Sequence, residues 1–96
     1  MNKDDFLKSL TEDIPDSNYT QLLAALWWDK KGDWDRAHSI AQDVPCRDGS
    51  WVHAYLHRVE GDEWNASYWY NRANKKVPNQ SLEEEWNTLV DFFLDQ

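Results

Sequence analysis

The feature that most constrains the fold of this 96-residue chain is a short motif that occurs twice. Gly32-Asp33 and Gly61-Asp62 are 29 residues apart. The same offset relates two pairs of alanines, Ala25 with Ala54 and Ala37 with Ala66. Glycine accepts the left-handed conformation that ends a helix, and aspartate caps the helix that follows. Small residues let two helices approach closely where they cross. The motif therefore predicts two helical hairpins.

Helical periodicity extends beyond these hairpins, and no strand-like alternation is sustained. We therefore predict an all-α fold of about six short helices in a single domain. The first helix carries Phe6, Leu7, Leu10 and Ile14, and the second begins at an N-cap on Ser17. The remaining expected helices cover residues 33–44, a segment capped by Ser50 that ends at Gly61, residues 62–76, and a last helix opened by the capping box Ser81-Leu82-Glu83-Glu84.

The two units resemble tetratricopeptide repeats (TPR). The second reads Ala54-x-x-His57, Gly61-Asp62, Ala66-x-x-x-Tyr70, Ala73 and Pro78, and the first reads Ala25-x-x-Trp28, Gly32-Asp33 and Ala37-x-x-x-Ala41. This order of small and aromatic positions is similar to the TPR pattern, although its period is shorter than the usual ~34 residues. The resemblance implies a TPR-like superhelix with an N-terminal helix at 1–16, repeats at 17–46 and 47–80, and a C-terminal capping helix at 81–96.

The charge distribution excludes some classes of partner. The formal net charge is −8, and residues 77–96 carry five acidic residues and no basic residue. No segment forms the basic stripe that a nucleic-acid binder needs, and an acidic surface is repelled by anionic lipid. The single cysteine, Cys46, excludes an intrachain disulfide. The chain shows no signal peptide and no apolar run of ~20 residues, so we expect a cytoplasmic protein with no membrane partner.

The TPR resemblance also implies a concave groove lined by the first helix of each unit. Its expected lining residues are Leu22, Leu26 and Asp29 from one unit and Trp51, Tyr55 and Arg58 from the other. Trp, Tyr and Arg are enriched at binding hot spots. We therefore expect a non-catalytic module that binds a protein or peptide and uses no cofactor. The alternative for this face is packing inside the fold. A separate possibility is self-association through exposed aromatic surface elsewhere on the chain, which would give a homodimer.

A second functional hypothesis centres on His53 and His57. These histidines are four residues apart on one expected helix, which is a spacing that can hold a metal ion. His38, Cys46 and Glu60 are candidates to complete such a site. This pattern indicates a small metal- or ligand-binding protein, with an enzyme as one form of it.

Two further groups have simpler interpretations. Cys46 beside Arg47 has the features of a reactive thiol, but the sequence shows no partner that would orient it. Glu83, Glu84 and Glu85 are expected to be solvated side chains at a helix N-terminus, where the helix dipole stabilises negative charge.

Overall fold

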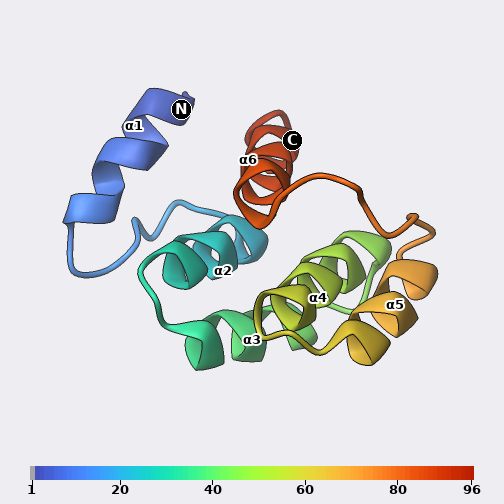
Figure 1. Cartoon of the computed structure of the whole chain (residues 1–96). Helices are drawn as coiled ribbons and strands as arrows, with labels where there is room; N and C mark the ends of the chain where they lie inside the picture. The colour runs from blue at the N-terminus through green and yellow to red at the C-terminus, as the bar shows by residue number, and fades with distance from the viewer. Residues whose placement is uncertain (1) are drawn as a thin grey trace.

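The computed structural model describes residues 2–96, which contain helices and no strand (Figure 1). The predicted all-α class is therefore confirmed for this part of the chain. The elements are α1 (Lys3–Lys8), the 3₁₀ helix η1 (Ser9–Thr11), α2 (Gln21–Lys30), α3 (Trp34–Gln42), α4 (Arg47–Val59), α5 (Glu63–Arg72) and α6 (Leu82–Leu94).

The two Gly-Asp motifs form matching turns, one between α2 and α3 and the other between α4 and α5. Gly32 and Gly61 have φ angles of 91° and 87°, in the left-handed region. The N–H groups of Asp33 and Asp62 each donate to a carbonyl of the preceding helix at 2.9 Å. Each aspartate side chain then accepts a hydrogen bond from the first turn of the next helix. The predicted pair of hairpin turns is thus confirmed.

The hairpins pack so that α2 and α4 lie in the middle of the molecule (Figure 1). Helices α3 and α5 lie on one side of this central pair, and α1 and α6 lie on the other. The TPR resemblance implies a C-terminal capping helix at 81–96. Helix α6 forms in this segment and packs across α2 and α4, and α1 packs against α6.

The start of α4 differs from the prediction for a steric reason. The expected N-cap was Ser50, but α4 begins at Arg47, with Cys46 in the N-cap position. The extra turn is accommodated because Gly49 lies against the carbonyl of Val44, where an added Cβ would be 2.0 Å from the carbonyl oxygen. A helix can approach the preceding loop this closely only where a residue has no side chain.

Three other helix boundaries also differ from the prediction. Thr20 rather than Ser17 caps α2, because a tight turn at Asp16–Tyr19 delays the helix. Helix α5 ends at Arg72 instead of residue 76, since Asn74 adopts a left-handed φ of 59°. Ile14 lies outside the first helix and is 69% exposed.

Most of the core comes from α2, α4 and α6. The largest side chains with less than 2% exposure are Trp27, Trp86, Tyr70, Phe6, Leu26, Leu56, Leu89, Glu85, Val52 and Val90. The predicted capping box at Ser81 and Glu84 is confirmed, and it starts α6. Among residues 2–96, no helix combines the length and the apolar character that crossing a bilayer requires.

Candidate metal centre

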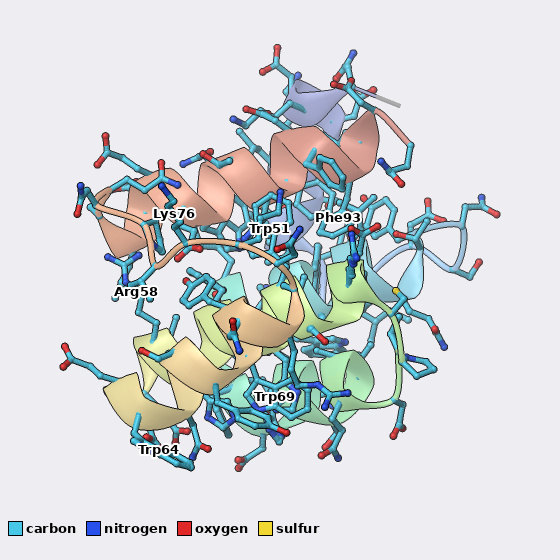
Figure 2. The ribbon with its side chains drawn as sticks, turned by 90° about the vertical axis from the view of Figure 1, so that its right-hand side faces the viewer. Trp51, Arg58, Trp64, Trp69, Lys76 and Phe93 are labelled. Atoms are coloured by element: carbon cyan, nitrogen blue, oxygen red, sulfur yellow. The ribbon has the colours of Figure 1, made fainter. Side chains whose placement is uncertain are left out.

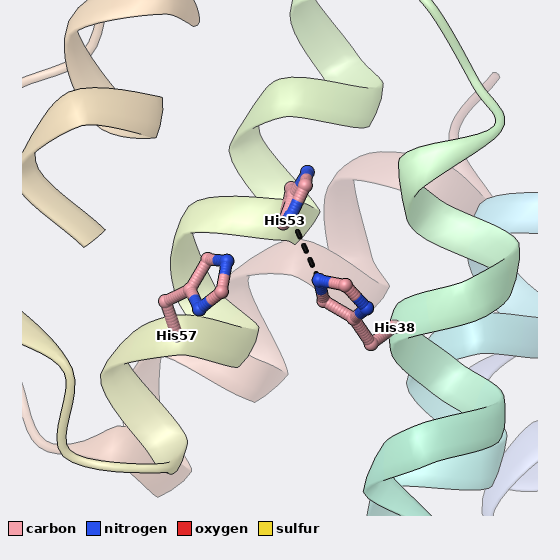
Figure 3. Close-up of side chains that lie close together, drawn as sticks. All are labelled: His38, His53 and His57. Carbon is pink, nitrogen blue, oxygen red and sulfur yellow. Dashed lines mark hydrogen bonds between the residues drawn. The ribbon is translucent and has the colours of Figure 1, made fainter. Parts of the chain in front are cut away.

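Three histidines from two helices meet on the face of α4 that is turned toward α3 and α5 (Figure 3). His53 and His57 lie one turn apart on α4, and both are buried. His38 reaches them from α3, which packs against α4. The sequence predicted the pair His53 and His57. Of the three side chains proposed to complete the site, the structure brings His38 to this pair.

The ring nitrogens are close enough to act together. The Nε2 atoms of His38 and His53 are 2.9 Å apart and share a hydrogen bond. One nitrogen from each of the three rings lies within 4.8 Å of the others. Two imidazole ligands of a tetrahedral zinc ion have nitrogens about 3.3 Å apart, given Zn–N bonds of ~2.0–2.1 Å. Small side-chain rotations would therefore bring the three nitrogens to one metal ion.

A carboxylate orients the third histidine. Nδ1 of His57 lies 2.7 Å from Oε2 of Glu60, the residue that caps the C-terminal end of α4. The Nδ1–H group donates to this carboxylate, so Nε2 keeps the lone pair that a metal ion would use. A carboxylate that holds a ligating histidine in this way is a common second partner in metal sites. Glu60 therefore belongs to the site as the residue that orients His57.

Two tryptophans form the walls of the cluster. Trp34 stacks on His38 with ring centroids 4.7 Å apart, and its Nε1–H donates to the carbonyl of Leu56 at 2.6 Å. Trp69 stacks on His53 at 4.0 Å. These contacts restrict the histidine rings and exclude water from their faces, which keeps the donor atoms together in the absence of a bound ion.

The surroundings keep two of the histidines neutral. Burial, followed by the neighbouring His38 and His57, lowers the pKa of His53 from its ordinary 6.5 to about 4. Burial, and then the charge of His57, also lowers the pKa of His38, against the opposing effect of Glu60 and Asp35. Neutral imidazole is the form that binds metal ions. Protons therefore compete weakly for these two side chains at neutral pH.

This burial makes the stability of the metal-free protein depend on pH. The unfolded chain binds a proton at His53 below about pH 6.5, whereas the folded chain does so only near pH 4. Stability is therefore expected to fall as the pH is lowered from 6.5 toward 4, because the unfolded state binds more protons. Urea unfolding between pH 7 and 5 measures this slope, and a His53→Gln variant should reduce it. Equal unfolding midpoints across that interval would contradict the expectation.

Cys46 is an exposed free thiol in the N-cap position of α4, and it is not in the group of donor atoms that contains His53. A second group of potential ligands, His57, Glu60 and Asp62, lies next to the first. Asp62 already accepts hydrogen bonds from Asn65 as the cap of α5, so we assign it a structural role.

The residues predicted to line a groove come together on α2 and α4, and α6 covers them. Leu22, Leu26, Trp51 and Tyr55 are all buried. Trp51 packs against two aromatic residues of α6, and Figure 2 shows it close to one of them, Phe93. The binding of a peptide on this face stays a prediction, and it requires α6 to leave. The exposed aromatic residues that a homodimer would use lie on α5, where Trp64 is 76% exposed.

The face of α2 and α4 that α6 covers contains a polar network, which the sequence did not predict. Glu85 is 1% exposed, and both its oxygens accept hydrogen bonds from the Tyr70 hydroxyl, at 2.7 and 2.6 Å. Nη1 of Arg58 donates to the same carboxylate at 2.9 Å. The expectation that Glu85 is solvated is therefore wrong, because α6 turns this side chain toward α4 and α5.

Asp29 belongs to the same buried face. It accepts a hydrogen bond from the Tyr55 hydroxyl at 3.0 Å. Burial raises the pKa of Asp29, and the hydrogen bond from Tyr55 opposes this rise. Thus Asp29 and Arg58, which were predicted to line the groove, each have a partner within the chain.

Comparisons with known proteins add no family to this description: no protein-family model matches the chain, and no curated protein or solved structure is detectably similar to it.

Proposed function

We propose that this protein binds a divalent transition-metal ion, with His38, His53 and His57 as ligands. The observation that carries the proposal is the convergence of three imidazole nitrogens within 4.8 Å, from two helices and between two tryptophans. Imidazole is a ligand for zinc, copper, nickel and iron, whereas calcium and magnesium prefer oxygen. Three protein ligands leave one position of a tetrahedral site for water or a further ligand.

The test is a thermal-unfolding titration of protein freed of metal by a chelator. A ligand at a hundredfold excess over its dissociation constant stabilises the folded state by about 2.7 kcal/mol. For a domain of this size, that corresponds to an increase in Tm on the order of 10 °C. We therefore expect Zn²⁺ to raise the Tm by this amount, and Mg²⁺ at the same concentration to leave it unchanged.

Matched variants separate the site from other zinc-binding groups. His38→Gln removes the half-buried ligand on α3 and is expected to abolish the zinc effect while leaving the helical content unchanged. Cys46→Ser removes the exposed thiol and should respond to zinc like the parent protein. The proposal fails if the parent shows no increase, or if His38→Gln shows the same increase as the parent.

We also infer that the two hairpins form a TPR-like pair. The inference is supported by the 29-residue offset between the hairpins, by their identical Gly-Asp turns and by the packing of α3 against α4. In this arrangement α2 and α4 are the first helices of the two units, and α6 occupies the face that would be the groove. An experimental structure with α2 and α4 on opposite sides of the molecule would contradict it.

A further inference from the structure

A pocket of about 530 Å³ lies next to the histidine cluster. The C-terminal ends of α3 and α5 and the N-terminal end of α4 surround it. Its walls include His53, Trp69, Arg47 and Arg72. This volume is in the range of small-molecule sites, which combine apolar walls with a few polar groups.

The charge of this pocket is opposite to that of the whole chain. The chain has a net charge of −8, yet two arginines line the pocket and no aspartate or glutamate does. Within residues 2–96, neither Arg47 nor Arg72 takes part in an ion pair, whereas Arg36 and Arg58 do. The guanidinium carbon of Arg72 lies 5.3 Å from the ring centroid of Trp69, and Trp69 in turn stacks on His53. Two guanidinium groups that form no ion pair favour an anionic ligand at this pocket.

His53 connects this pocket to the proposed metal site. This residue is 6% exposed, and its side chain contributes Nε2 to the cluster. The other ring nitrogen, Nδ1, has no hydrogen-bond partner among the residues that the structure describes, and it remains accessible to solvent. Figure 3 shows it on the side of the ring away from His38, toward the start of α4. A metal ion on Nε2 leaves the proton on Nδ1, and a ligating histidine normally donates this proton to an acceptor. Glu60 is that acceptor for His57, and His53 has none within the chain.

We propose that the pocket binds a small organic anion, whose carboxylate or phosphate group accepts hydrogen bonds from Arg47, Arg72 and Nδ1–H of His53. The apolar part of the ligand lies against Trp69 and the Val44-Pro45 segment, which also line the pocket. The role of His53 in this inference rests on the proposed metal function, but the arginine pocket exists without a metal ion. Anion and metal then share one histidine, and each is expected to strengthen the binding of the other by the same factor.

The first experiment uses protein without metal and follows its ¹H–¹⁵N NMR spectrum during titrations at constant ionic strength. The probes are inorganic phosphate, benzoate, and the neutral benzamide as a control for the ring alone. We expect saturable shifts confined to the pocket with either anion, and none with benzamide. Stronger binding of benzoate indicates a carboxylate ligand, and stronger binding of phosphate indicates a phosphate ester. The absence of saturation, or shifts spread over all basic residues, would overturn the proposal and indicate an adventitious ion only.

Arginine variants locate the binding site. The double variant Arg47→Ala/Arg72→Ala is expected to weaken benzoate binding at least tenfold. Arg36→Ala removes an exposed arginine that does not line this pocket and should bind benzoate like the parent protein. Equal affinities in the double variant and the parent would overturn the assignment of these arginines.

The zinc-loaded protein tests the role of His53, with benzoate as the probe because phosphate precipitates zinc. Benzoate is expected to bind several-fold more tightly when zinc is present, and this gain should disappear in His38→Gln. An unchanged benzoate affinity in a protein that binds zinc would refute the role of His53. If the parent binds benzoate but not zinc, the metal function fails and the arginine pocket stands. If it binds zinc but not benzoate, the pocket fails and the metal function stands.

Discussion

Replacing Glu85 with alanine is expected to lower the free energy of unfolding by about 3–5 kcal/mol, the cost of leaving a buried charge without its partner. The variant would leave Arg58 without its counter-ion and the Tyr70 hydroxyl without its acceptor, beneath α6. Small domains have a total stability of about 5–15 kcal/mol, so the loss is a large share of it. Urea unfolding monitored by circular dichroism measures this difference.

Two controls separate the buried network from the general effect of removing acidic residues. Glu83 precedes Glu85 by two residues and is exposed, so Glu83→Ala should change the free energy of unfolding by no more than about 0.5 kcal/mol. The double variant Arg58→Met/Glu85→Leu replaces the ion pair with apolar side chains. It should recover part of the loss, because buried ion pairs carry a large desolvation cost. Equal stability of Glu85→Ala and Glu83→Ala would show that α6 does not dock through this carboxylate.

The second large effect is expected for Trp86, which anchors α6 on α2. This side chain is 1% exposed, and its Nε1–H donates to the carbonyl of Leu26 at 2.9 Å. Trp86→Ala removes the ring and leaves a cavity, a change that typically costs about 3–5 kcal/mol. Thermal and urea unfolding of the variant are the measurements.

A conservative variant divides this loss into its parts. Trp86→Phe keeps much of the apolar volume and removes the hydrogen bond, so it should cost clearly less than the alanine variant. A cost for Trp86→Ala below about 1 kcal/mol would mean that α6 packs only loosely on α2. In that case the face that α6 covers would be open to the peptide binding predicted from the sequence.

Local features of the fold could be predicted from the sequence, because they depend on neighbouring residues. The Gly-Asp turns and the capping box at Ser81 are of this kind, since the residues that make each hydrogen bond are a few positions apart. The start of α4 could not be predicted, because it depends on the contact between Gly49 and the Val44 carbonyl in the folded chain.

The candidate sites also combine features that the sequence spacing predicts with features that depend on how the helices pack. The pair His53 and His57 follows from helical spacing alone, whereas the approach of His38 depends on how α3 packs against α4. The burial of Glu85 could not be predicted, because three consecutive glutamates at a helix start are usually solvated and only the docking of α6 buries one of them. The pocket at Arg47 and Arg72 joins the ends of three helices, and no spacing along the sequence indicates it.

The position of α1 beside α6 has a practical consequence for handling the protein. Lys3 and Asp91 form an ion pair at 3.0 Å, so the first and last helices lie together on the side of α2 and α4 opposite α3 and α5 (Figure 1). A fluorophore or a surface linker attached through α1 would therefore leave the histidine cluster accessible, whereas Gln96, after α6, lies beside Val44 and Cys46, which also line the arginine pocket. A polyhistidine tag is the exception, because its imidazoles would compete for zinc wherever they are attached.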